Sequence, residues 1–344
     1  MTGLRLPRRR GAAAIVAAGL AAAALAGCGG GSGPGGGGGH GGAASSSSST
    51  STTEAPLAVA SASWHLAAPI SRAVVEDYGG QLLVVGGLAQ GDVSTAGIWS
   101  FDPATGAARQ LGSLASAVHD AAGAVLGGRV VVFGGGAAAT VATVQAWSGS
   151  GRASAVAELP RPRSDLGAAE LGQTAYVVGG FDGSTLDPEV LSTTDGTTYK
   201  VAGTLAQAVR YPAVAAGAGY LWVVGGDLSP SESNPSASQT DDVQRFDPST
   251  GRTTVVGHLP TPLGHASAGF VGGRLVVAGG RTGTDPATAV YSVDPRTGAV
   301  TPAGNLPSPR SDAGAVVIGS TLWLVGGELG SVTRPLDTVA SISG

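Results

Sequence analysis

The feature that most limits the fold is a glycine doublet that ends six short runs of strand-forming residues. The runs are LLVVGG, VVVFGG, YVVGG, LWVVGG, LVVAGG and LWLVGG, and their first glycines stand at positions 86, 134, 179, 225, 279 and 326. Glycine in a strand usually marks a bulge or a close approach of another backbone. A repeat of roughly 50 residues is typical of propellers and solenoids. The doublets therefore predict an array of similar units.

Composition excludes several classes of protein. The chain has 344 residues, a net charge of −4 and only 12% charged residues, so it has no electrostatic reason to bind nucleic acid. Its single cysteine, Cys28, excludes an intramolecular disulfide. Lys200 is the only lysine among 19 basic residues, a usage that suggests a GC-rich bacterial genome. Burial must hold the fold together, and about 280 residues suffice for one large all-β domain.

The N-terminus has the pattern of a bacterial export signal over residues 1–27. Arg5 and the RRR run at 8–10 precede an apolar run of small residues at 11–26. At about 16 residues this run is short for a transmembrane helix. It ends in LAGC at 25–28, which resembles the lipobox of bacterial lipoproteins. The resemblance implies cleavage before Cys28 and lipidation of that cysteine, which would anchor the protein to the extracytoplasmic face of the cell membrane. The alternative is an ordinary signal peptide with a cysteine there by chance.

Residues 28–56 are predicted to be a flexible linker after the lipidated Cys28. They are nearly all Gly, Ser, Ala and Thr, and such a segment cannot bury a core. A Gly/Ser-rich chain of this length reaches about 30 Å on average. The folded part is therefore expected to lie on a tether near the membrane.

Each repeat reads as four short antiparallel strands. A strand of small residues precedes the doublet strand, and a third strand with an aromatic residue follows it, as at Trp99 and Trp147. Tight turns lead to the fourth strand in FDPATG at 101–106, FDPSTG at 246–251 and VDPRTG at 293–298. In these turns Asp is expected to cap the turn, Pro to hold φ at the value that the turn needs, and Gly to occupy the position with positive φ. Four such strands make one propeller blade.

These residues resemble the kelch family of β-propellers. The doublets, the Asp-Pro-x-Thr-Gly turns, and the segments LPRPRSD at 159–165 and LPSPRSD at 306–312 carry the resemblance. It implies an all-β, six-bladed kelch-type propeller over residues 57–344. The last repeat lacks a fourth strand, whereas SASWHLA at 61–67 is left over before the first repeat. Pairing this N-terminal strand into the last blade would close the ring and remove two open edges.

A basic or titratable residue stands about 14–16 residues before each doublet. On a propeller these residues would line the mouth of the central channel, where they could bind a carboxylate or sulfate. The alternative is that they tie neighbouring blades together. Asp165 and Asp312 would neutralise part of such a ring. The candidate ligand-binding residues are Arg72, His119, Arg163, Arg210, His265 and Arg310.

The long Ser/Pro-rich loop at 227–242 would lie on the same face as these residues. It reads either as a disordered segment or as a lid or contact loop.

Enzyme motifs are weak. No nucleophile, phosphate-binding or cofactor motif occurs, so no cofactor and no catalytic residue are predicted. Copper radical chemistry, as in kelch-type galactose oxidases, needs a cysteine crosslinked to tyrosine, and Cys28 is the predicted anchor. His119 and His265 would lie on opposite sides of the ring, too far apart to share a metal, and no metal site is predicted. Glu76, Asp77 and Glu170 fall on inner strands with no spacing that pairs them for acid/base work.

The sequence therefore favours a monomeric, membrane-anchored binding module for a glycan, peptide or envelope protein. The alternative is a carbohydrate-active enzyme that resembles the kelch-type sialic acid mutarotases and uses an Arg/Glu pair near the channel. That alternative requires a convergent cluster of arginines and carboxylates in a closed pocket.

The anchoring prediction is tested by Cys28→Ala. The variant lacks the thiol that would carry the lipid, so we expect release from the membrane fraction or accumulation of the unprocessed precursor. Cell fractionation detects release from the membrane, and intact-mass measurement detects the unprocessed precursor. Membrane retention and mass like those of the wild type would contradict a lipid anchor at Cys28.

Overall fold

The computed structural model describes residues 55–230, 238–330 and 334–344. Every regular element in these ranges is a β-strand, and none of the ranges contains a helix long and apolar enough to cross a membrane. The predicted signal peptide, Cys28 and the linker up to residue 54 lie outside the described residues, as does the 231–237 part of the long loop.

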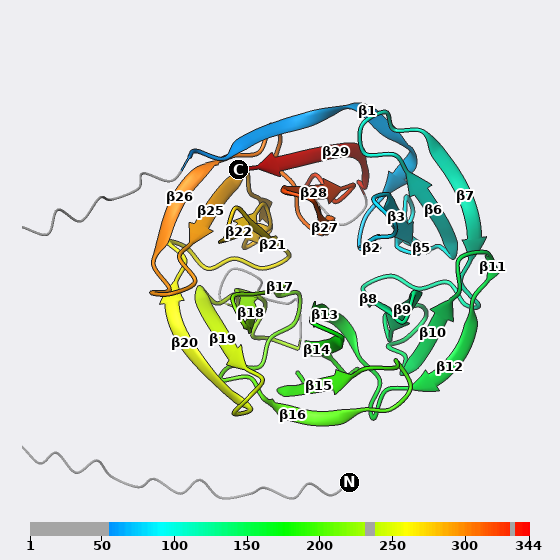
Figure 1. The fold of residues 1–344 in the computed structure, drawn as a ribbon, viewed down its shortest axis with the longest axis horizontal. Coiled ribbons are helices and arrows are strands. Elements are labelled where there is room, and N and C mark those ends of the chain that lie inside the picture. Colours follow the sequence, from blue (N-terminus) through cyan, green and yellow to red (C-terminus); the bar gives the residue numbers. More distant parts are fainter. Residues whose placement is uncertain (1–54, 231–237, 331–333) are drawn as a thin grey trace, which may run out of the picture. The chain divides into compact units, whose positions relative to one another are not determined.

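Six sheets are arranged around a central axis, which confirms the predicted six-bladed propeller (Figure 1). In each blade the chain starts at the innermost strand and moves outward. Blades 1 to 3 consist of β2 (Val74–Asp77), β3 (Leu82–Val85), β6 (Gly97–Phe101) and β7 (Ala108–Ser113); β8 (Ala122–Leu126), β9 (Arg129–Phe133), β10 (Thr143–Trp147) and β12 (Ser154–Glu158); β13 (Ser164–Leu171), β14 (Thr174–Phe181), β15 (Glu189–Thr193) and β16 (Lys200–Thr204).

The remaining blades repeat the order. Blades 4 to 6 consist of β17 (Ala213–Gly217), β18 (Tyr220–Val224), β19 (Asp242–Asp247) and β20 (Arg252–His258); β21 (Ser267–Val271), β22 (Arg274–Ala278), β25 (Ala289–Val293) and β26 (Val300–Asn305); β27 (Gly314–Ile318), β28 (Thr321–Val325), β29 (Leu336–Ser343) and β1 (Ala58–Ile70). Short accessory strands are β4 (Leu88–Ala89), β5 (Val93–Ser94), β11 (Gly151–Arg152), β23 (Arg281–Thr282) and β24 (Asp285–Pro286).

The N-terminal strand closes the ring, as predicted from residues 61–67. β1 pairs antiparallel with β29, from Ala58 opposite Ser343 to Ile70 opposite Leu336 (Figure 1). Trp64 of β1 stacks on Phe101 of blade 1, with ring centroids 6.0 Å apart, and its Nε1 donates to the carbonyl oxygen of Pro103 at 3.1 Å. The closing strand therefore completes blade 6 and also packs against blade 1.

The glycine doublets join each blade to the next one. At Gly86 and Gly87 the backbone has φ of 64° and 101°, in the region that disfavours residues with a side chain. The N–H of Gly87 donates to the carbonyl oxygen of Val118 in the segment leading into blade 2, at 2.8 Å. A Cβ on Gly86 would lie 2.7 Å from that same oxygen. The doublet is thus a close contact between backbones, and this contact recurs in all six blades.

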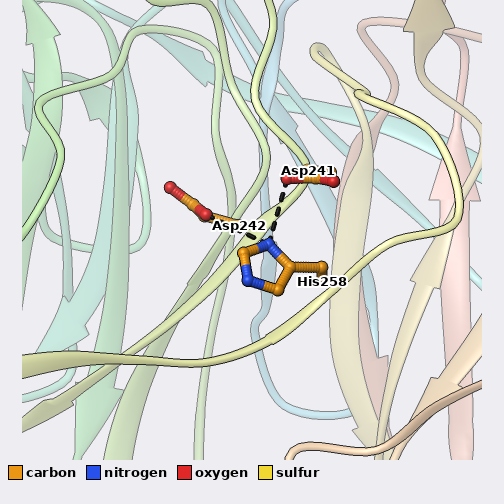
Figure 2. A group of neighbouring side chains, drawn as sticks. All are labelled: Asp241, Asp242 and His258. Carbon is orange, nitrogen blue, oxygen red and sulfur yellow. Dashed lines mark hydrogen bonds and ion pairs between the residues drawn. The ribbon is translucent and has the colours of Figure 1, made fainter. Parts of the chain in front are cut away.

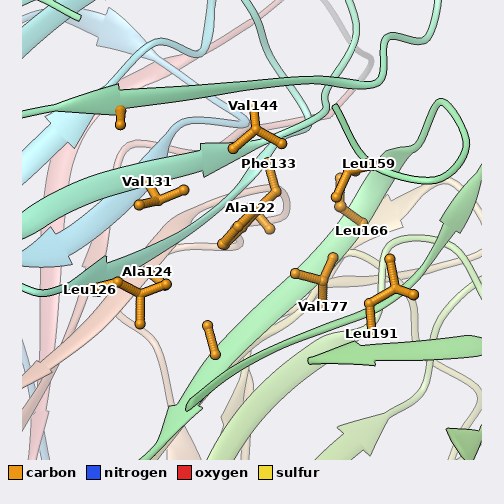
Figure 3. Packing of buried hydrophobic residues seen from close by; sticks show 12 residues of the cluster. Ala122, Ala124, Leu126, Val131, Phe133, Val144, Leu159, Leu166, Val177 and Leu191 are labelled. Atoms are coloured by element: carbon orange, nitrogen blue, oxygen red, sulfur yellow. The ribbon is translucent and has the colours of Figure 1, made fainter. Parts of the chain in front are cut away.

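The hydrophobic core is divided among the interfaces between blades. Between blades 2 and 3, for example, Leu126, Phe133 and Val144 pack against Leu166 and Val177, all of them buried (Figure 3). Five further clusters occupy the other interfaces. Each blade therefore depends on both neighbours for burial, and the closing strand completes the last interface.

Closure by β1 gives a prediction about truncation. Deleting residues 29–56 should leave the melting temperature nearly unchanged, because the deletion ends before β1 begins at Ala58. Deleting through Ala67 removes the Trp64 contact and the buried Leu66, so it should lower the free energy of unfolding by at least roughly 3 kcal/mol, the cost of truncating one large buried apolar side chain. Thermal and urea unfolding compare the two variants, and equal stability would contradict closure by β1.

Candidate functional site

Six residues with left-handed backbone surround one end of the central channel. We call them the mouth ring. Five of them stand two residues before the innermost strand of their blade, and Asp165 is the second residue of β13. Their φ values lie between 50° and 58°, and they are Arg72, Asp120, Asp165, Tyr211, His265 and Asp312.

Backbone hydrogen bonds link the mouth ring into a closed circle. The N–H of each residue donates to the carbonyl oxygen of the equivalent residue in the preceding blade. The distances are 2.7–3.1 Å, for Asp120 to Arg72, Asp165 to Asp120, Tyr211 to Asp165, His265 to Tyr211, Asp312 to His265, and Arg72 to Asp312. The left-handed turn therefore directs six side chains toward one small region from a rigid frame.

Arg72 and Tyr211 bridge the mouth. The two residues belong to blades 1 and 4, which lie opposite one another, and Nη1 of Arg72 donates to the hydroxyl of Tyr211 at 3.1 Å. The same Nη1 donates to Asp120 at 3.0 Å, while Nε donates to Glu328 at 2.9 Å. Arg210 donates to the Tyr211 hydroxyl from the other side, at 3.1 Å. A network of charged groups thus crosses the mouth.

A second group of charged residues directly follows the doublets. In blades 4, 5 and 6 these residues are Asp227, Arg281 and Glu328, and all three are buried. His265 lies between Asp312, at 2.6 Å, and Asp227, at 3.3 Å, and Arg281 lies 3.3 Å from the other Asp312 oxygen. Blades 4, 5 and 6 therefore each add a second charged residue to the mouth.

Burial and neighbouring charges shift the pKa values in this network. Burial and the nearby Asp120 raise the pKa of Asp165 to about 7, although Arg210, 2.9 Å away, acts in the opposite direction. Burial favours neutral His265, but Asp312 and Asp227 outweigh it and raise the His265 pKa. Burial would raise the pKa of Asp312, but His265, Arg72 and Arg281 lower it. His265 and Asp312 thus each favour the charged form of the other, and Asp165 titrates close to neutral pH.

The six residues singled out from the sequence do not form one ring. Arg72 and His265 belong to the mouth ring. His119 and Arg210 each stand one residue before a member of the mouth ring. His119 bonds Ser94 at 2.9 Å and lies 3.7 Å from Asp120. The remaining two arginines, Arg163 and Arg310, precede the ring by two residues and extend into their blades.

Arg163 and Arg310 make contacts within the blades. Arg163 donates to Asp187 at 2.5 Å and to the carbonyl oxygen of Glu189 at 3.0 Å. Arg310 donates to the carbonyl oxygens of Gly326 and Thr338 at 2.7 and 2.9 Å. Both arginines are almost fully buried. These two side chains therefore have structural contacts, but the contacts lie within one blade and do not tie neighbouring blades together.

Sequence reasoning missed Asp120 and Tyr211, together with the residues after the doublets. A spacing signal was present, because each mouth-ring residue stands 14 residues before the first glycine of its own doublet. Selection by residue type, over a window of 14–16 residues, picked arginines and histidines from three different positions. The constant spacing reflects the constant number of residues from the mouth-ring residue through the first turn of the blade to the doublet.

The channel has room for small groups at the mouth and for larger ones farther in. The mouth ring lines a cavity of about 120 Å³. Ala73, Ala121 and Pro212 line both this cavity and a second one of about 170 Å³ along the innermost strands. A third cavity of about 380 Å³ shares Glu76 and Gly123 with the second. The three cavities therefore form one lumen.

One surface group offers three metal-type donors among the described residues. His258 Nδ1 lies 3.1 Å from an Asp241 oxygen and 3.3 Å from an Asp242 oxygen, across the β19–β20 pair (Figure 2). The His258 side chain is 60% exposed, and a hydrogen bond between His258 and Asp241 accounts for their contact. The absence of a metal site remains a prediction from the sequence.

Comparison with known proteins agrees with the architecture. A family model described as Kelch motif matches residues 262–307, which contain blade 5 with its doublet and its Asp-Pro-Arg-Thr-Gly turn. The fold is a kelch-type β-propeller.

Solved structures show the same fold for the propeller. One described as "Structure of YjhT" is similar over 82% of this chain and 99% of that chain, with a TM-score of 0.67 at 14% identity. At that identity the likeness concerns the fold alone. No curated protein sequence matches the chain significantly.

The contacts of Arg163 give a prediction about stability. Arg163→Ala leaves the buried Asp187 carboxylate without its partner, so it should lower the free energy of unfolding by about 3–5 kcal/mol. Arg161→Ala is the matched control, since Arg161 is half exposed and pairs with Glu189 at the surface, at 3.2 Å. That change should cost less than about 1 kcal/mol. Urea unfolding of both variants tests the difference, and similar losses would contradict a structural role specific to Arg163.

Proposed function

We propose that the protein is a non-catalytic binding module of the bacterial cell envelope, tethered to the membrane through lipidated Cys28. Its propeller binds a glycan or protein ligand at the face that carries the mouth ring. The tether is inferred from the lipobox-like LAGC at 25–28. The binding face is inferred from the size and chemistry of the mouth.

The size of the mouth cavity is the observation that carries the proposal. At about 120 Å³ this outermost part of the lumen is by itself well below the range of about 300–1,000 Å³ that is usual for small-molecule sites. The Arg72–Tyr211 bridge and the backbone ring limit its expansion. Such a cavity accepts one functional group of a larger ligand, whose remaining contacts lie on the surrounding loops.

The chemistry of the mouth favours a ligand that donates hydrogen bonds. Five carboxylates face three arginines and His265 in the network: Asp120, Asp165, Asp227, Asp312 and Glu328. One oxygen of Glu328 and one of Asp227 are buried with no hydrogen-bond partner among the described residues. Arg72 and Arg210 already face carboxylates, which disfavours a simple anion ring. Hydroxyl or amine groups, as on glycans and proteins, match the surplus of acceptors.

Exposed apolar residues lie on connections of the mouth face. In a four-stranded antiparallel blade, the connection between the second and third strands lies on the same face as the segment leading into the blade. Val93, Leu228 and Leu329 occupy these connections in blades 1, 4 and 6, and they are 57%, 36% and 42% exposed. Gln239, at the end of the long loop, bonds to Gly283 of blade 5 at 2.8 Å. The loops therefore supply apolar contacts around a polar centre, as at protein-binding surfaces.

The enzyme alternative has one observation in its favour. Arg72, Glu328 and Asp120 form a convergent cluster of an arginine and two carboxylates, which a carbohydrate-active site would need. The cavity beside them is too small for a whole sugar acid, and the Arg72 side chain is engaged on both sides. The binding module is therefore the better supported function.

The binding face is tested with two matched valines. Ligands are first obtained by glycan-array and pull-down screening with the chain from residue 29. Val93 and Val201 are both 57% exposed, but Val201 lies on the outer strand β16. Val93→Asp should weaken binding of the selected ligand at least tenfold by placing a charge in the contact surface, whereas Val201→Asp should leave affinity unchanged.

Surface plasmon resonance measures both variants, with thermal melts to establish that they fold. If Val201→Asp weakened binding and Val93→Asp did not, the ligand would bind at the outer strands. Turnover of a bound glycan, followed by NMR, would favour the enzyme.

A further inference from the structure

The inner part of the lumen holds two carboxylates that the mouth network does not use. Glu76 on β2 and Glu170 on β13 both line the cavity of about 380 Å³, near the turns that join the two innermost strands of each blade. This is the end of the channel away from the mouth ring. The two glutamates come from blades 1 and 3, so sequence spacing gave no reason to pair them.

Gly123 of blade 2 lies between the two glutamates and makes room for them. A Cβ on Gly123 would lie 2.5 Å from an oxygen of Glu76, so the Glu76 carboxylate leans across blade 2 toward blade 3. Glu170 reaches blade 2 from the other side and accepts the backbone N–H of Val125. The two carboxylates therefore approach one another over a strand that carries no side chain at this point.

No cation faces this pair among the residues that line the cavity. Burial, Glu170 and the neighbouring Asp77 raise the pKa of Glu76 to about 8. Glu170 is exposed at this end of the channel; partial burial of its carboxyl group raises its pKa, although its bond from Val125 acts in the opposite direction. Asp77 itself is exposed and accepts the N–H of Gly80 at 2.7 Å. At neutral pH the pair thus retains a proton that a bound cation would replace.

The opposite wall of the cavity is apolar. Blades 4 to 6 contribute Val214, Phe270, Val316 and Val317. Phe270 lies against Gly217 and packs on Trp222, with ring centroids 6.3 Å apart. The cavity therefore combines an acidic wall with an apolar, aromatic wall, and its volume falls within the usual range for small ligands.

We propose that this inner lumen binds an organic ammonium ion, with the ammonium group between Glu76 and Glu170 and its hydrocarbon part against Phe270 and the valines. An ammonium offers three donors to two carboxylates. A divalent metal fits less well, since Ca²⁺ takes about 6–8 oxygen ligands and one Glu170 oxygen already accepts an N–H. Primary amines, polyamines and lysine side chains belong to the proposed ligand class.

Binding is coupled to proton release. When the ammonium enters at pH 7, the carboxyl proton of Glu76 passes to the buffer and the carboxylate pairs with the cation. Affinity should therefore rise between pH 6 and 8.5, and the number of protons released should fall toward zero at pH 9, where Glu76 is already ionised.

The test uses pentylammonium chloride as the probe and the chain from residue 29. Isothermal titration calorimetry at pH 7, in two buffers of different ionisation enthalpy, should give one site and a release approaching one proton. Glu76→Gln and Glu170→Gln should each weaken binding at least tenfold. Glu158→Gln is the matched control, because Glu158 is an exposed carboxylate on the outer strand β12 and does not line the cavity, and it should bind like the wild type.

Several results would overturn the proposal. Equal affinity for pentanol and pentylammonium would reduce the site to an apolar cavity, and binding of CaCl₂ but not of pentylammonium would make it a metal site. Undetectable wild-type binding at 50 mM pentylammonium, or unchanged affinity in both glutamine variants, would exclude it. Glu76→Gln resembles the protonated side chain, so a normal thermal melt at pH 7 shows that its loss of binding is not a loss of folding.

Discussion

The backbone hydrogen bonds between neighbouring blades are the constraint on which the rest of the molecule depends. The second glycine of each doublet donates to a carbonyl oxygen in the next blade, at 2.8–2.9 Å, and the circle ends with Gly327 donating to Ile70. A Cβ on the first glycine would lie 2.0–2.7 Å from that same oxygen. No other residue fits there, so the doublet recurs wherever one blade meets the next.

This contact fixes the geometry of the mouth. It holds the segment leading into each blade, and two residues later that segment turns through a left-handed residue that bonds to its equivalent in the preceding blade. Aspartate tolerates such a backbone relatively well, but arginine and tyrosine are uncommon there. Arg72 and Tyr211 occupy these positions and bond to each other across the channel. Strain of this kind is often found at functional sites, which agrees with binding at this face.

The lumen connects two chemically different ends. The mouth contains compensated charges on a rigid frame, whereas the inner cavity contains two glutamates without a counter-cation among its lining residues and an apolar wall. The innermost strands between these ends are rich in alanine and glycine, which keeps the channel open. A single scaffold can therefore present a face for a large ligand and a separate cavity for a small cation.

The sequence by itself determined the six blades, their four-stranded pattern, the Asp-Pro-x-Thr-Gly turns and the closing strand that contains Trp64. These features depend on local backbone chemistry repeated at a regular spacing, so each can be recognised within one repeat. Tertiary structure alone decided which side chains meet. Arg72 and Tyr211 are 139 residues apart, and a shift of two residues sends Arg163 and Arg310 into the blades instead of the channel. Glu76 and Glu170 approach each other only because Gly123 of the blade between them has no side chain, a coincidence of three repeats that arises when the ring closes.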